Sequence, residues 1–144
     1  MKLKKTIILS GIILLTAYIA KASGKQDTTT LSNEPAISIF IKAVSGEGSE
    51  NLQDALDDSF QYSMQQLNKQ VTLDKRYFIG FFKRNAIFRQ GYTLQVTQVM
   101  QNKNLGVVKV DMHYKTFTRS YYLSLTDNGS GQKIIYVYDV ITND

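Results

Sequence analysis

The chain has 144 residues, with 17 lysines and arginines, 12 acidic residues, one histidine and no cysteine or tryptophan. Without cysteine there is no disulfide framework and no thiolate metal site, and a single histidine leaves too few ligands for a transition-metal centre. We therefore expect no metal and no cofactor.

Residues 1–22 have the pattern of a cleavable secretory signal peptide. Three lysines lie within the first five residues, residues 6–20 are uncharged and largely apolar, and a small-x-small pattern ends at Ala22. The apolar stretch is shorter than the ~20 residues that a stable transmembrane helix needs. We predict cleavage after Ala22 and an exported protein, periplasmic or secreted. The alternative is an inner-membrane protein anchored by residues 6–20.

The positive charge of the chain belongs mostly to this leader. The formal net charge is +5, and the leader carries four basic residues and no acid (Lys2, Lys4, Lys5 and Lys21). The mature chain of about 122 residues then has a net charge of about +1 and the size of one domain. The basic balance therefore does not indicate a nucleic-acid-binding protein, and we expect no nucleic-acid partner.

The first part of the mature chain is predicted to be helical. Residues 23–34 are polar and predict a flexible arm, and residues 35–144 form the single domain. Apolar residues at i, i+3, i+4 and i+7 predict a helix over 36–44. A second helical pattern covers 52–67, with extended chain as the alternative from Phe60 onward, and a third covers 73–85.

After Gly91 the apolar period changes from about 3.6 to 2, which predicts strands. Four strands are expected, and the last is apolar or aromatic on both faces, which is typical of a covered strand (92–101, 108–115, 120–125 and 133–141). Helices that precede an antiparallel sheet define an α+β protein. We predict N-terminal helices packed on the concave face of a strongly curved four-stranded antiparallel β-meander.

This pattern resembles the nuclear-transport-factor-2-like superfamily, the α+β cone also called cystatin-like. The resemblance covers about residues 35–142 and is carried by PAISIFIKAVSGEGSENLQDALDDSF, LDKRYFIGFFKRN and SYYLSLTDNGSGQKIIYVYDVI. The chain departs from many members in having no Trp in the last strand. The superfamily includes isomerases, dehydratases, adaptors, secretion-machine assembly domains and small exported proteins, so the resemblance implies the fold and leaves the function open.

Few residues are candidates for chemistry. Asp111 and His113 share a strand face with Lys109 and Lys115, so we interpret them as a solvated polar face rather than an acid–base pair. Asp139 is a lone carboxyl on an otherwise apolar strand. If it is buried, its pKa is expected to rise and it becomes a site residue; the alternative is that it lies in water near the strand end. The candidate ligand pocket therefore comprises Tyr121, Tyr136, Tyr138 and Asp139, although the tyrosines could equally fill the core.

Residues 75–89 carry aromatic residues and no acid, with five cations as candidate contacts for a partner (Lys75, Arg76, Lys83, Arg84 and Arg89). The simplest interpretation is a core-packing helix with a solvated basic face. An acidic protein partner or a membrane surface is the alternative.

Together these patterns predict an exported, non-catalytic binding domain of the bacterial envelope that holds a protein partner or a small apolar ligand, with a homodimer through the sheet as a further option. One alternative is a membrane-anchored periplasmic assembly subunit of a secretion system. Another is a small isomerase-like or hydrolyase-like enzyme that acts in the cone.

Overall fold

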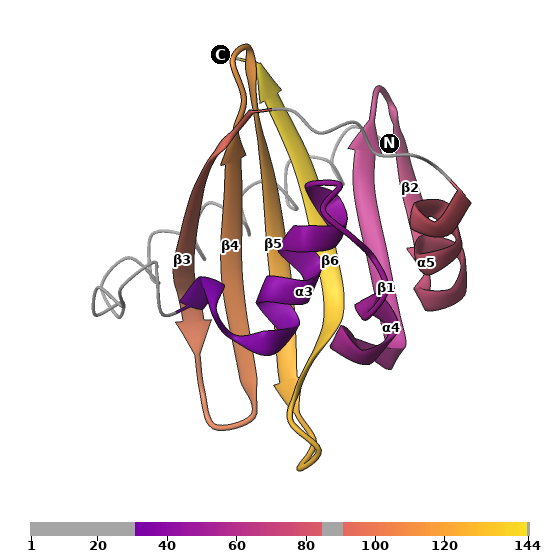
Figure 1. Ribbon diagram of the computed structural model, residues 1–144, viewed down its shortest axis with the longest axis vertical. Coiled ribbons are helices and arrows are strands. Elements are labelled where there is room, and N and C mark those ends of the chain that lie inside the picture. Colours follow the sequence, from indigo (N-terminus) through magenta and orange to yellow (C-terminus); the bar gives the residue numbers. More distant parts are fainter. Residues whose placement is uncertain (1–30, 85–90, 144) are drawn as a thin grey trace, which may run out of the picture.

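The structure is a computed structural model, and it describes residues 31–84 and 91–143 (Figure 1). The expected signal peptide, most of the arm and Arg89 lie outside the described residues. Three helices and six strands alternate irregularly along this part of the chain: α3 (Pro35–Val44), α4 (Leu52–Ala55), β1 (Leu56–Gln66), β2 (Lys69–Asp74), α5 (Lys75–Arg84), β3 (Thr93–Gln101), β4 (Leu105–His113), β5 (Phe117–Asp127) and β6 (Gln132–Asn143).

The six strands form one sheet in the order β2-β1-β6-β5-β4-β3. All neighbouring strands are antiparallel except β1 and β6, which run parallel. The α+β class is confirmed, but the predicted four-stranded, purely antiparallel sheet is wrong: two further strands precede the four that the apolar period indicates. Strand β6 lies inside the sheet between β1 and β5.

The missed strands begin where a second helix was expected. Leu56, Phe60 and Met64 are spaced four apart and therefore fit one side of a helix, but they also share one face of a strand. In β1 this face, with Tyr62, is turned to the core, and Phe60 and Tyr62 are 1% and 5% exposed. Pairing with β6 on one side and β2 on the other outweighs the helical spacing.

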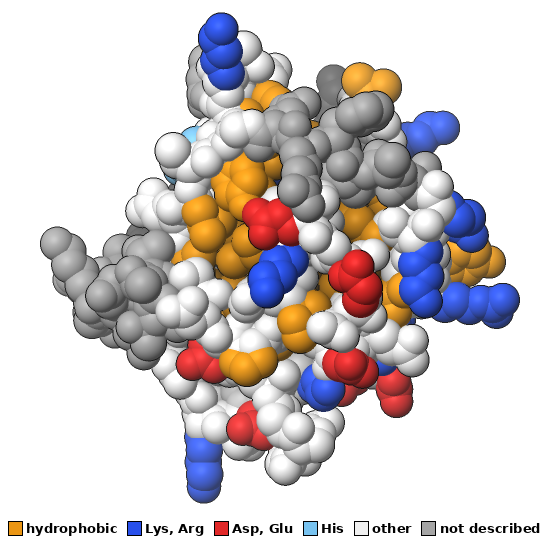
Figure 2. All heavy atoms as spheres, in the orientation of Figure 1, with side chains coloured by type: hydrophobic (Ala, Val, Ile, Leu, Met, Phe, Trp, Pro, Cys, Tyr) orange, Lys and Arg blue, Asp and Glu red, His pale blue; other side chains and the backbone are white. Residues whose placement is uncertain are grey.

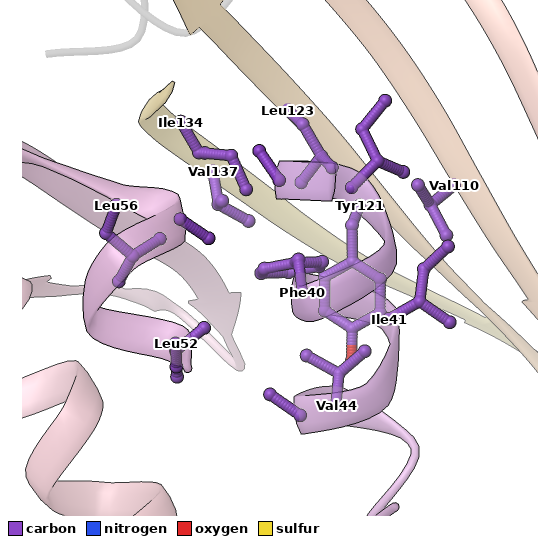
Figure 3. Close-up of a cluster of buried hydrophobic side chains, with 14 of the residues drawn as sticks. Phe40, Ile41, Val44, Leu52, Leu56, Val110, Tyr121, Leu123, Ile134 and Val137 are labelled. Atoms are coloured by element: carbon purple, nitrogen blue, oxygen red, sulfur yellow. The ribbon is translucent and has the colours of Figure 1, made fainter. Parts of the chain in front are cut away.

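Helix α3 covers the middle of the concave face of the sheet (Figure 1). Its buried side chains include Ile37, Phe40, Ile41 and Val44, which confirms the predicted apolar stripe. In Figure 3 Phe40 and Ile41 lie against Tyr121 of β5, and the rings of Phe40 and Tyr121 meet edge-on with centroids 5.2 Å apart. The chain leaves the helix through Gly46, two residues after Val44, whose φ of 80° is a conformation that glycine adopts readily.

Bulges bend the sheet around these helices. The register shifts between Gln98 and Met100 in β3, between Ser124 and Leu125 in β5, and within the β1–β6 pair. An extra residue in one strand increases local bend and twist. At the sheet end nearest the arm, Leu31 is 5% exposed and joins the core, so residue 31 packs on the domain rather than lying free. In the described ranges, no helix has the length and apolarity to cross a membrane.

Candidate ligand site

A cavity of about 420 Å³ opens between α5, the end of α3 and the sheet. Its walls are mainly apolar and aromatic, with three side chains that carry polar groups: Val44, Met64, Val71, Leu73, Phe78, Phe81 and Phe82 form the apolar part, and Tyr62, Arg119 and Tyr121 the polar part. An apolar cavity with a few convergent polar groups is the usual form of a small-molecule site.

Phe78 holds α5 over this cavity. It is 3% exposed and its ring lies within contact distance of Phe60, Tyr62 and Phe82, with centroids 4.9 to 5.1 Å apart. Since α5 packs on β1 and β2, this aromatic cluster fixes the helix against the β1 side of the sheet. The sequence positions these rings because Phe78 and Phe82 are four residues apart on one side of the helix.

The polar end of the cavity is an ion pair on the inner sheet face. Asp139 is 1% exposed, so the interpretation that places it in water at the strand end is wrong. The Nε of Arg119 lies 3.0 Å from both carboxylate oxygens, and its Nη2 lies 2.5 Å from Oδ2. The hydroxyl of Tyr62 donates to the same Oδ2 at 2.5 Å. Both carboxylate oxygens are therefore occupied.

Burial and this carboxylate govern the titration of the neighbouring groups. Burial, and then the charge of Asp139, raise the pKa of the Tyr62 hydroxyl well above its usual range. Burial is the largest single effect on Arg119 and opposes its charge, but the hydrogen bonds to Asp139 and the electrostatic interactions with Tyr121, Asp139 and Tyr62 together outweigh it, so its pKa is raised. Burial also raises the pKa of Tyr121, although the nearby Arg119 opposes the shift. Both tyrosines therefore stay protonated and act as neutral hydrogen-bonding groups.

Tyr121 lies beneath Arg119 and links the ion pair to the core. The guanidinium carbon of Arg119 lies 5.2 Å from the centre of the Tyr121 ring, which is a cation–π contact. Figure 3 shows the Tyr121 hydroxyl directed toward Val44, which also lines the cavity. The contacts of Arg119 described above use Nε and Nη2. Arg119 also lines the cavity, so its guanidinium, which has five N–H donors, supplies the cationic part of the wall.

The structure brings together only two of the four predicted pocket residues. Tyr121 and Asp139 are direct partners across β5 and β6 and face inward. Tyr136 and Tyr138 alternate with Val137 and Asp139, so they lie on the opposite, outer face, where Tyr138 pairs with Ser63 and Tyr122. They do not line the cavity. The outer face that they share is where the predicted homodimer would form, and that interaction stays a prediction.

Sequence reasoning missed Tyr62 and Arg119. The signal for Arg119 was present, because it shares the i, i+2 row of Tyr121, Leu123 and Leu125 and is the one cation in that inward row. A lone cation on an apolar row of β5 opposite a lone acid on β6 predicts a buried pair. Tyr62 was not singled out, because its segment was expected to be helical, with extended chain from Phe60 onward only as the alternative.

The Asp111–His113 pair lies on the outer face, as predicted. Val108, Val110 and Met112 are the buried inward row. Asp111 accepts a hydrogen bond from Ser120 Oγ at 2.5 Å and pairs with Lys109 at 2.9 Å, while Nδ1 of His113 lies 3.0 Å from Thr118 Oγ1. Asp111 is more buried than a solvated face implies, at 6% exposed. The two side chains contact different partners and do not form an acid–base couple.

The predicted partner surface stays a prediction. Lys75 forms an ion pair with Asp58 at 3.0 Å and donates to the Leu56 carbonyl. Arg76, Lys83 and Arg84 are exposed on α5. Over residues 31–84 and 91–143, no group of three or more His, Cys, Asp or Glu side chains could hold a metal ion.

Known structures share this fold. An NTF2-like (nuclear-transport-factor-2-like) protein of unknown function from Silicibacter pomeroyi superposes with a TM-score of 0.64 at 9% identity, covering 81% of this chain and 100% of that one. A cystatin-like fold protein from Burkholderia xenovorans gives 0.57 at 8% identity, covering 74% and 85%. A putative ketosteroid isomerase from Parabacteroides distasonis gives 0.55 at 14%, covering 72% and 82%.

The chain therefore has the α+β cone fold of the nuclear-transport-factor-2-like, or cystatin-like, superfamily, as its sequence predicted. No protein-family model matches the sequence, and no curated protein is significantly similar to it. At these identities the shared feature is the fold, and function has to be argued from the site.

Proposed function

We propose that the chain is a non-catalytic binding domain that holds a small apolar ligand in the cavity between α5, α3 and the sheet. The observation that carries this proposal is the state of Asp139. Its side chain is 0% exposed and both of its oxygens contact Arg119. Asp139 is not itself among the residues that line the cavity, and the described walls contain no carboxyl group and no histidine. The site thus offers apolar area and hydrogen-bond donors, but no free general base.

An isomerase-like or hydrolyase-like enzyme is the second candidate, because one structural neighbour is described as a putative ketosteroid isomerase. Such an enzyme would need a carboxylate, or a tyrosine of lowered pKa, facing the substrate. Here the carboxylate lies behind Tyr62 and Arg119, and the pKa values of Tyr62 and Tyr121 are raised. These features favour binding over catalysis.

Filling the cavity should weaken ligand binding. Val71→Phe places a larger side chain on the cavity wall, so we expect the affinity for the neutral dye Nile red to fall at least about tenfold, or ~1.4 kcal/mol. Val107→Phe is the matched control, because Val107 is half-buried on the outer face of β4. Fluorescence titration measures both. Equal affinities for the two variants, or no binding by the unsubstituted chain, would contradict the proposal.

We further propose that the domain is exported to the bacterial envelope. The support is the leader pattern of residues 1–22, with its cationic start, short apolar stretch and small residues before Ser23. The membrane-anchored assembly subunit is the alternative, in which residues 6–20 are retained.

A further inference from the structure

One side of the molecule exposes apolar side chains that its core does not use. Leu67 is 94% exposed at the tip of the β1–β2 hairpin, and Tyr77 is 63% exposed on α5. Both are large, and neither lines the cavity. Single exposed apolar residues are common on protein surfaces, so exposure alone does not mark a site. Two further features distinguish this side of the molecule.

The first feature is the backbone of Leu67. Its φ is 54°, and it is the only non-glycine residue with a positive φ in the described ranges. Asn and Gly adopt this conformation readily, whereas a bulky L-residue is a rare occupant. A leucine that is both strained and almost fully exposed contributes little to the stability of the fold. Strained positions concentrate at functional surfaces.

The second feature is the charge around these two residues. Four cations are exposed on the same elements: Lys69, Arg76, Lys83 and Arg84. Helix α5 contains no acidic residue. Two acids lie next to the helix: Asp58 pairs with Lys75, and Asp74 accepts a hydrogen bond from the Tyr77 amide at the start of α5. Figure 2 shows Lys and Arg side chains gathered along the edge that carries α5, with hydrophobic side chains among them.

The hairpin tip and α5 lie beside the same opening. Met64 and Val71 are partners in the β1–β2 pair, and both line the cavity together with residues of α5. Leu67 is three residues beyond Met64, which is about 10 Å at ~3.3 Å per strand residue. A partner surface that contacted both the β1–β2 hairpin tip and α5 would therefore lie next to the cavity.

We propose that this docking edge, formed by Leu67, Lys69, Tyr77 and the exposed cations of α5, binds the surface of an anionic phospholipid membrane. Apolar and aromatic tips enter the interfacial layer, while lysines and arginines meet the anionic headgroups. Cations dominate the charge of this edge, since the exposed charged side chains of α5 are all Lys or Arg. The proposal stands apart from the ligand cavity, because none of these residues lines it.

The test uses the absence of tryptophan from the chain. Leu67→Trp and Tyr77→Trp each place one fluorophore on the docking edge of the full chain, and Lys103→Trp places one on the exposed β3–β4 hairpin as the control. Each is mixed with vesicles of phosphatidylcholine alone or with phosphatidylglycerol. We expect a blue shift and quenching by brominated acyl chains for the first two variants on anionic vesicles only. A local fluorophore is needed because residues 6–20 could themselves bind lipid.

The charge contribution is tested in the Leu67→Trp background. Lys83→Gln should raise the lipid concentration for the half-maximal blue shift about fivefold, the effect of about one surface cation. Lys103→Gln, the same change at a distant exposed lysine, should leave it unchanged. Water-exposed emission at positions 67 and 77 on anionic vesicles would overturn the proposal. So would a shift on phosphatidylcholine alone, or one that Lys83→Gln leaves unchanged.

Discussion

At the scale of single residues, the burial of Asp139 depends on its ion pair with Arg119. Either charge alone on the inner sheet face would cost free energy, because a buried charge loses its hydration. Register places Tyr121 opposite Asp139, and Arg119 two residues along the same row reaches the carboxylate diagonally. Tyr62 supplies the remaining donor from β1. Three strands thus meet at one carboxylate, which ties β1 to the β5–β6 hairpin through side chains as well as backbone.

The raised pKa of Tyr62 predicts a loss of stability in alkali. Below about pH 10 the tyrosine is protonated in both states and adds no pH dependence. Above that, the unfolded chain releases the proton while the folded chain retains it, so the free energy of unfolding falls as pH rises, by up to ~1.4 kcal/mol per pH unit for this group. Tyr62→Phe removes this contribution and should lessen the slope.

Urea unfolding at several pH values above about pH 9 measures that slope. Tyr77→Phe makes the same change at an exposed position and is the matched control. The comparison uses slopes, because Tyr62→Phe also removes a donor from Asp139 and lowers stability at every pH. Identical slopes for Tyr62→Phe and the unsubstituted chain would show that the Tyr62 hydroxyl does not titrate in this way.

Whether the sequence identified a site residue depended on the pattern around that single residue. Asp139 was recognisable as the only acid on an apolar strand, and Tyr121 as part of an inward row. Tyr136 and Tyr138 were misplaced because β6 is apolar on both faces, so alternation alone could not say which face is inward. Arg119 was overlooked because a cation is usually assigned to the solvent-facing side of a strand, whereas Arg119 lies in the inward row of Tyr121 and Leu123 in β5.

At the scale of elements, the period of apolar residues identified α3 and the strands from β3 to β6. It failed for β1 because Leu56, Phe60 and Met64 are compatible with both periods, and only the partner strand decides between them. It failed for β2 because a six-residue strand at the sheet edge has few buried residues to form a pattern. The break at Gln98 in the apolar row of β3 turned out to be a bulge, in which its side chain donates to the Met100 carbonyl at 2.7 Å.

The β1–β2 hairpin offers a test of backbone strain. Leu67→Asn keeps φ 54° with a residue that tolerates it, so we expect the free energy of unfolding to rise by about 1 kcal/mol. Leu67→Ala shortens the side chain without easing the backbone and should give no such gain. Urea unfolding of the two variants measures the difference. Equal stabilities would mean that the conformation of Leu67 is not strained.

At the scale of the whole molecule, the decisive prediction concerns the leader. Expressed in a bacterial host, the full chain should give a soluble periplasmic species that begins at Ser23, because residues 1–22 fit a signal-peptidase substrate. Cell fractionation and intact mass measure this outcome. A membrane-bound species that retains residues 1–22 would contradict export as a free domain and favour the anchored assembly subunit.

The position of β6 affects how the domain folds during synthesis. This strand follows the other five in the sequence, yet it lies between β1 and β5, and its parallel contact with β1 joins residues such as Tyr62 and Val137. During synthesis, β1 and β2 have no central partner until β6 has left the ribosome. Such long-range pairing slows folding and leaves apolar strands open to unwanted contacts in the meantime. We therefore expect the β1–β2 side of the nascent chain to stay without its sheet partner, and accessible to chaperones or a translocation channel, until β6 is available.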